Sequence, residues 1–133
     1  MAITNAVCNS FKVEALDGVH LAADVYKIAL FTGAATLSKA TTAYAATNEI
    51  TGTNYVAGGA TLAGRSNTLV GDAATLTWTS PTWATTTQTA RGALIYNSTR
   101  SNKAVCVLDF GADITSTADT FTVTLPSNLL AET

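Results

Sequence analysis

Apolar and polar residues alternate with a period of two along much of this chain, and that period predicts β-strands. The alternation is clearest near the end of the chain, where Phe121, Val123 and Leu125 are separated by threonines. Leu76 and Trp78 alternate with threonines in the same way. Because successive strand residues point to opposite faces, we expect the large side chains to face inward and the hydroxyls outward.

Turn-forming residues divide the chain into short predicted strands. A hairpin is expected across Gly71-Asp72, and a second across the polar loop 97–102, while Pro81 and Pro126 interrupt the pattern. Residues 33–52 are rich in Ala and Thr without periodicity, which predicts a long irregular excursion with a turn at 48–52. The strand predicted at 25–32 is apolar on both faces and so expected to be central. The other predicted strands are 60–64, which ends in a break at 65–67, 68–70 paired with 74–79, 90–96 paired with 103–110, and 120–125.

One short segment near the start has a helical period instead. Ser10 or Asn9 is a candidate for its N-terminal cap and Gly18 for its C-terminal cap. We expect its apolar stripe to form a lid on the core of the sheet. The stripe consists of Phe11, Ala15, Leu16 and Val19.

These elements predict a mainly all-β fold in a single domain over residues 1–133. About seven or eight antiparallel strands with one short N-terminal helix are typical of a β-sandwich or a jelly-roll-like barrel. The chain has no internal repeat and no linker long enough to divide it.

The composition indicates a protein that ends up in an assembly. Charged residues make up only 12% of 133 residues, the net charge is −2, and Ala and Thr together supply more than a third of the positions. The seven Lys and Arg residues are scattered, so we expect no binding to nucleic acid. We also expect no signal peptide and no membrane span, because the apolar stretches are far shorter than about 18 residues. A weakly charged surface protects poorly against association.

Two cysteines, Cys8 and Cys106, match no metal-binding or redox spacing. Cys106 lies in an apolar run and is expected to be a buried free thiol. A disulfide between the two remains open at this stage.

Candidate catalytic residues are few, and we expect no enzyme activity. The only histidine, His20, follows the predicted helix, where a packing or surface role is far more common than general-base catalysis. A carboxylate pair for acid–base chemistry would be Asp109 with Asp113, or Asp17 with Asp24. The simpler interpretation is that these acids bond the backbone of local turns.

Binding motifs are equally weak, and we expect no metal and no cofactor. Asp113 and Asp119 in the predicted DITSTAD turn do not follow the EF-hand spacing. The glycines at 58, 59 and 64 lack the Lys-Ser or Lys-Thr of a phosphate loop and are expected at turns or bulges. Trp78 and Trp83 are candidates for a sugar-binding platform, against core packing, and the same ambiguity holds for two tyrosines. These are Tyr44 and Tyr55.

Two blocks of the sequence resemble the head decoration, or cement, proteins of tailed bacteriophages. The first is KIALFTGAATLSKATTAYAATNEITGTNYVAGGATLAG at 27–64, and the second is TARGALIYNSTRSNKAVCVLDFGADITSTADTFTVTLP at 89–126. Together they span most of the chain. The resemblance rests on scaffold residues, and it implies a protein of the virion that binds the outside of the capsid and cements neighbouring subunits.

The expected partner is therefore the major capsid protein, with self-association into a dimer or trimer on the capsid exterior after synthesis in the host cytoplasm. Residues 1–10 are the first candidate for a capsid-contacting arm, removable without unfolding the domain, and residues 33–52 are the second. Two alternatives stay open: a tail or fibre protein of the virion, and a carbohydrate-binding β-sandwich module that uses Trp78 and Trp83.

Overall fold

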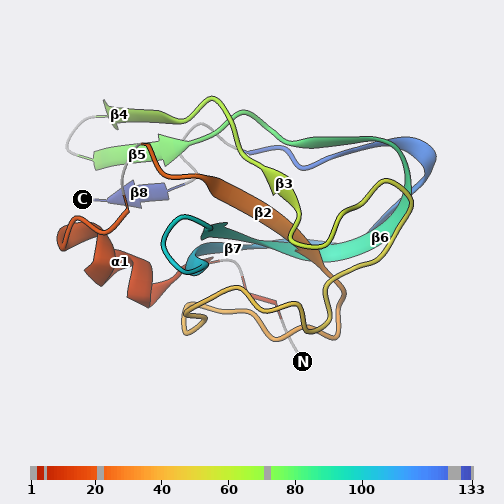
Figure 1. Ribbon diagram of the computed structural model, residues 1–133, viewed down its shortest axis with the longest axis horizontal. Coiled ribbons are helices and arrows are strands. Elements are labelled where there is room, and N and C mark those ends of the chain that lie inside the picture. The colour runs from red at the N-terminus through yellow and green to blue at the C-terminus, as the bar shows by residue number, and fades with distance from the viewer. Residues whose placement is uncertain (1–2, 5, 21–22, 71–72, 126–129, 133) are drawn as a thin grey trace.

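The computed structural model, which describes residues 3–4, 6–20, 23–70, 73–125 and 130–132, contains two antiparallel sheets (Figure 1). The larger sheet has the order β1-β7-β6-β2-β3 and the smaller one β4-β5-β8. The fold is all-β, as predicted. The strands are β1 Ala6–Val7, β2 Tyr26–Phe31, β3 Ala60–Thr61, β4 Ser66–Val70, β5 Ala73–Thr77, β6 Thr82–Asn97, β7 Lys103–Thr122 and β8 Leu130–Glu132.

The larger sheet is covered on both faces. On one face the Tyr26 ring of β2 lies 5.3 Å from the Trp78 ring, just beyond β5, so the smaller sheet covers this side. On the other face the Tyr96 ring of β6 stacks on Tyr44, which belongs to the long connection between β2 and β3. We call residues 33–59 of that connection the excursion. Figure 1 shows the first, orange part of the excursion below the larger sheet, its yellow part rising beside β6, and the smaller sheet above.

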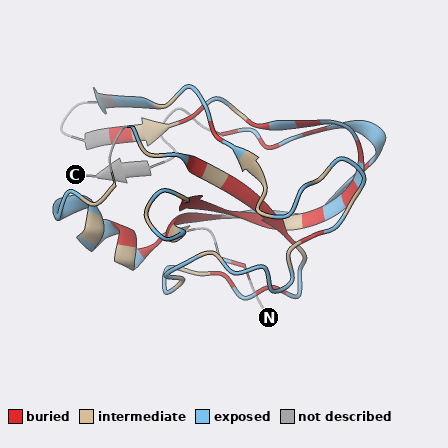
Figure 2. Cartoon of the chain, viewed as in Figure 1, coloured by how far each residue is buried: buried red, intermediate tan, exposed pale blue. Residues whose placement is uncertain are grey.

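Burial on both faces explains the apolar character of β2 and of the inner parts of β6 and β7. Ile28, Leu94 and Val105 are completely or almost completely buried, and Figure 2 shows the buried residues concentrated along these strands. The prediction of a largely apolar, interior strand at 25–32 is confirmed by β2.

The hairpin of β6 and β7 dominates the sheet. Its turn at 97–102 is confirmed, since Asn97 pairs with Lys103. Both strands are far longer than predicted, and the predicted turn at 113–119 and the separate strand at 120–125 are wrong, because β7 continues through them to Thr122. The cause is cross-strand pairing with β6: the turn-like residues of 113–119 stay in the strand, and the register shifts between the two strands are β-bulges.

The smaller sheet contains the second predicted hairpin. β4 and β5 pair antiparallel from Ser66 opposite Thr77. The strand predicted at 60–64 ends at Thr61, and the break after it lies at 62–65 and not at 65–67. The expected turn residues 71–72 lie outside the described residues. Trp78 is buried as predicted, but Thr75 is also buried, so the hydroxyls of this strand do not all face outward. The inward alternation of the three apolar residues from Phe121 to Leu125 is confirmed.

The predicted helix is α1, Asn9–Leu16. Its end matches the prediction, because Gly18 follows it in the left-handed region with φ of 74°. Its start does not: the capping position is Cys8, and no side chain caps the helix there. The predicted apolar lid is also wrong, since only Phe11 is buried in the helix and the Leu16 side chain is 91% exposed.

The described part of residues 1–10 belongs to the folded body. β1 pairs with β7, Ile3 forms a parallel bridge with Leu37 of the excursion, and Ile3 and Cys8 are both buried. The expectation of an arm that can be removed without unfolding is therefore wrong, because its removal would take two side chains out of the core.

Candidate functional site

The excursion forms a broad surface of small, uncharged residues. Lys39 and Glu49 are its only charged residues, so their charges cancel. Most of its exposed positions are alanine or threonine, as at Ala40, Ala45 and Thr47. We call the exposed residues of 33–59 the excursion surface. It includes the segment 33–52 that the sequence predicted to be irregular, and the described structure has only isolated bridges and no strand there.

The underside of the excursion is fixed to the sheet by backbone and side-chain contacts. The Ile50 N–H donates to the Leu30 carbonyl at 3.0 Å, and Ile50 is buried. Farther along, the Asn54 amide donates to the Thr85 carbonyl of β6 at 2.8 Å. Ala35 and Leu37 add apolar burial on the same side. These contacts hold an irregular chain in one conformation.

A carboxylate lies at the centre of this attachment. Glu49 Oε1 accepts the Tyr44 hydroxyl at 2.5 Å, and Glu49 Oε2 accepts the Tyr55 hydroxyl at 2.5 Å and the Gly58 N–H at 2.8 Å. The Tyr55 hydroxyl in turn accepts the Leu30 N–H of β2 at 2.9 Å. One side chain therefore connects three points of the excursion and, through Tyr55, the sheet.

The tyrosines around this carboxylate are held in their neutral form. Burial raises the pKa of Tyr44 and of Tyr55, and the hydrogen bond to Glu49 raises it further. Tyr96, whose hydroxyl donates to the Gly58 carbonyl at 2.5 Å, also has a raised pKa, mainly because it is buried. All three hydroxyls remain hydrogen-bond donors at neutral pH.

The sequence indicated only part of this cluster. Tyr44 and Tyr55 were candidates for either packing or binding, and their rings and hydroxyls are used for packing and anchoring. Nothing in the local pattern marked Glu49 as their partner. A lone acid within a long neutral stretch was the one available signal.

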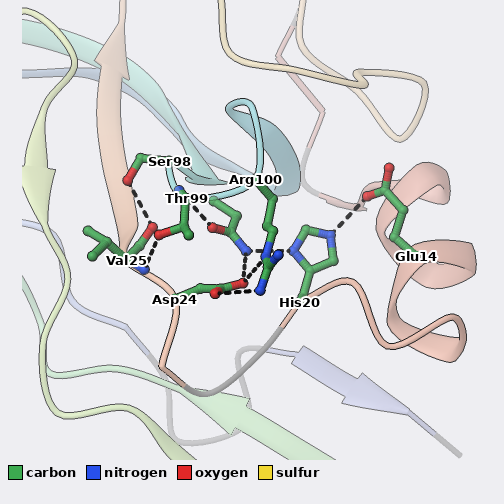
Figure 3. Close-up of polar contacts among 8 residues, drawn as sticks. Glu14, His20, Asp24, Val25, Ser98, Thr99 and Arg100 are labelled. Atoms are coloured by element: carbon green, nitrogen blue, oxygen red, sulfur yellow. Dashed lines mark hydrogen bonds and ion pairs between the residues drawn. The ribbon is translucent and has the colours of Figure 1, made fainter.

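His20, the candidate general base, is part of a different polar network, shown in Figure 3. Its Nε2 lies 2.9 Å from Glu14 Oε1 and its Nδ1 lies 3.1 Å from the Asn97 amide nitrogen. The Asn97 oxygen accepts the Thr99 N–H, so the amide nitrogen is the group that donates to Nδ1. Nε2 therefore carries the proton shared with Glu14. Both ring nitrogens are occupied, which leaves neither for activating a nucleophile.

Asp24 belongs to the same network. Its carboxylate accepts the Asn97 amide at 2.9 Å and two Arg100 nitrogens at 2.9 and 3.2 Å, and its side chain is only 4% exposed. Asp17, the acid considered with it, is the exposed residue that ends α1. The network fastens α1 and the segment after it to the turn between β6 and β7 (Figure 3).

The other candidate acids lie on β7 on either side of an arginine. Arg91 of β6 is 4.0 Å from Asp109 and 3.8 Å from Asp113. The Arg91 guanidinium contacts both carboxylates, so they form an ion-pair group and not two acids that face each other across a cleft. Asp119 is exposed and accepts the Thr120 N–H through its own side chain. Within the described ranges, no group of three or more His, Cys, Asp or Glu residues is arranged to hold a metal ion.

The two tryptophans are core residues. Trp78 is 4% exposed and contacts Tyr26, while Trp83 is 7% exposed and contacts Tyr55 and Phe121. A sugar-binding platform requires an exposed ring face, so neither ring has the exposure that the carbohydrate interpretation needs.

The cysteines are both free and buried. Cys106 pairs with Val7 across β1 and β7, so Cys8, the next residue, points toward the opposite face, where its thiol lies near the Ser38 carbonyl. Burial raises the pKa of Cys8 to about 11, and it raises the pKa of Cys106 as well. The thiols are therefore protonated and unreactive at neutral pH.

The glycines that were considered for a phosphate loop have backbone roles. Gly59 has φ of 82°, and a Cβ there would lie 1.8 Å from the Ile28 carbonyl oxygen. Gly64 has φ of 67° and lies against Thr79. The turn at 56–59, in which the Gly59 N–H donates to the Val56 carbonyl at 2.9 Å, confirms the expectation for Gly58 and Gly59, while Gly64 lies in the connection between β3 and β4.

Comparison with known proteins identifies no relative: no family model, no curated protein and no solved structure matches this chain. In the described part of the structure, no helix has the length and apolar character needed to cross a membrane.

Proposed function

We propose that this chain is a non-catalytic structural protein of a tailed-bacteriophage virion that binds the outside of the capsid and cements neighbouring major capsid subunits. The resemblance of residues 27–64 and 89–126 to head decoration proteins supports the proposal. The excursion surface is the proposed contact, and association of two or three copies on the capsid belongs to the same proposal.

The observation that carries the proposal is the contrast between the two sides of the excursion. Its underside is fixed by Glu49 and three tyrosines, whereas its outer side presents mostly small uncharged residues, with Lys39 as an exposed charge. A surface that is already ordered loses little conformational entropy on binding. Alanine has no polar group to desolvate, and a threonine hydroxyl costs little when it forms a hydrogen bond to the partner, so such a surface can make close contact with another protein.

A surface substitution tests this contact. Ala45 is exposed on the excursion, and Ala45→Glu places a charge there without removing a buried group. Ala15→Glu makes the same change on the exposed side of α1 and serves as the matched control. Each protein is mixed with capsids that lack it, and the copies bound per major capsid subunit are counted.

We expect Ala45→Glu to reduce the bound copies severalfold and Ala15→Glu to bind as the unmodified chain does. Equal binding by both variants would remove the excursion surface from the proposal. Binding of the unmodified chain to tails or fibres, and not to capsids, would favour the tail or fibre alternative.

A further inference from the structure

A second surface lies beyond the edge of the excursion, at the outer part of β7. A groove of about 330 Å³ opens there, and its volume is enough for one large side chain. Five of its lining residues are apolar, and the Ile114 side chain is 44% exposed. We call it the β7 groove. Its apolar lining consists of Leu108, Phe110, Ile114, Phe121 and Val123.

The groove and the part of the excursion around Tyr44 lie on different faces of the sheet. Leu108 pairs with Ala93, which pairs with Leu30, so these three side chains share one face. Residues of β2 on that face include Tyr26, which contacts Trp78 beside the smaller sheet. Tyr44 of the excursion stacks on Tyr96 on the opposite face. The two surfaces approach each other only at the bulge, where Asp113 lies near Gly33 of the excursion.

A large bulge in β7 shapes the groove. Gly92 pairs with Asp109 and Ala90 pairs with Ile114, so residues 110–113 stand opposite Arg91 alone. Gly111 takes φ of 80° within this bulge, and its N–H donates to Asp109 Oδ1 at 2.9 Å. Bulges redirect side chains and interrupt strand edges. This one leaves room for an inserted side chain, and it does not favour the addition of a long strand.

The edge of β7 beside the groove is open in the described structure. Pairing of β1 with β7 reaches only Val107, and beyond it the described strands and bridges place no neighbour on this side. Strand residues at an open edge have backbone groups that can bond to another polypeptide. The geometry therefore suits a short extended segment more than a compact small molecule.

The charges around the groove favour a positively charged segment. From Ala104 to Thr122, β7 carries Asp109, Asp113 and Asp119 and no cation. Arg91 on β6 offsets one of these charges, which leaves two negative charges on this end of the hairpin. A second copy of the same edge would bring like charges together, so charge complementarity favours a basic partner.

We infer that the β7 groove binds a short extended segment of a partner protein, which inserts one large apolar side chain between Leu108, Ile114 and Phe121 and carries lysine or arginine beside it. The apolar side chain fills the groove, and its neighbours in an extended segment point the other way, toward Asp109 and Asp113, which contact Arg91. This inference does not depend on a capsid role for the excursion surface, so either proposal can fail while the other stands.

Capped pentapeptides test the inference with the full chain. The first has leucine between two lysines and threonine at each end, the second has glutamates in place of the lysines, and the third has threonine in place of the leucine. Each is titrated into the ¹⁵N-labelled protein while amide chemical shifts are recorded. We expect the first peptide to shift residues 108–114 and 121–124 and to bind about three- to fivefold more tightly than the second, as two exposed ion pairs would give.

Two variants locate the contact. Ile114→Thr shortens the apolar wall, and Asp113→Asn removes a charge from a side chain that is 62% exposed; each should weaken binding of the lysine peptide severalfold. Asp17→Asn, at the residue that follows α1, makes the same charge change away from the groove and should leave binding unchanged. A well-dispersed spectrum of each variant verifies that it folds.

Three results would overturn the inference: equal binding of the lysine and glutamate peptides, undiminished binding of the peptide without leucine, or shifts confined to other residues. Shifts at 108–114 that depend on protein concentration without any peptide would instead assign the groove to a second copy of the chain.

Discussion

Glu49→Gln is the substitution that most directly tests how the excursion is held. In the folded chain the carboxylate accepts hydrogen bonds from the hydroxyls of Tyr44 and Tyr55 and from the Gly58 N–H. Glutamine keeps the size of the side chain but removes the charge and replaces one acceptor with a donor. The group that connects the three anchoring points of the excursion is then weakened, because every hydrogen bond to it becomes a neutral one.

The magnitude follows from the kind of bond. A hydrogen bond to a charged group contributes about 1.5–3 kcal/mol, and a neutral one about 0.5–1.5 kcal/mol. If the Gln oxygen takes the place nearest Tyr55 and Gly58, two charged bonds become neutral ones and the Tyr44 hydroxyl must reverse its role. We expect a loss of about 2–3 kcal/mol in the free energy of unfolding, which for a chain of this size lowers the Tm by roughly 6–12 °C.

Two assays check the prediction. Thermal unfolding followed by circular dichroism measures the Tm. Alkaline titration of phenolate absorbance measures the tyrosines: because the Glu49 carboxylate disfavours a nearby phenolate, its removal should lower the pKa of Tyr44 and Tyr55. Asp17→Asn makes the same change in net charge at an exposed position and should alter stability by less than about 0.5 kcal/mol. An unchanged Tm together with an unchanged titration would refute this account of the anchoring.

Three further predictions concern other parts of the chain. Gly59→Ala should lower the free energy of unfolding by more than about 3 kcal/mol in thermal melts, because its Cβ would overlap a β2 carbonyl. Gly18→Ala, at φ of 74° with open space around it, should lower it by only about 1–2 kcal/mol. Equal losses in the two variants would contradict the steric argument. Asp24→Asn should cost about 1–2 kcal/mol in urea unfolding, since its arginine partner is partly exposed; no loss would mean that the network of Figure 3 adds nothing to stability. Cys8 and Cys106 should react with iodoacetamide only after unfolding, and fast alkylation of the folded chain at pH 8 would contradict their burial. Because burial raises the pKa of both thiols, the free energy of unfolding should decrease above pH 9, where the unfolded thiols ionise first. For Cys8 this decrease should reach at most about 3 kcal/mol by about pH 11.

Local patterns were enough to predict the elements that are decided by local physics. The alternation around Phe121 and Leu125 identified the inward side chains, and Gly18 identified the end of α1, because only glycine takes that left-handed conformation without strain. The turn at 97–102 was predicted from polar residues that favour turns.

Features that depend on distant partners were not predictable in the same way. Residues 111–119 have a turn-like composition, yet pairing with β6 keeps them in a strand. The stripe of α1 suggested a lid, but only Phe11 meets the core, while the excursion covers the other face of the sheet. The roles of Glu49 and Asp24 likewise come from partners that no local pattern reveals, and for Asp24 those partners lie on the turn between β6 and β7.

The most direct test of the capsid proposal is cosedimentation of the purified chain with capsids that lack it, with the bound copies counted per major capsid subunit as the concentration is raised. Our account predicts binding that saturates at a fixed ratio to the capsid subunits. No sedimentation with capsids at any concentration, or a ratio that rises without saturating, would contradict it.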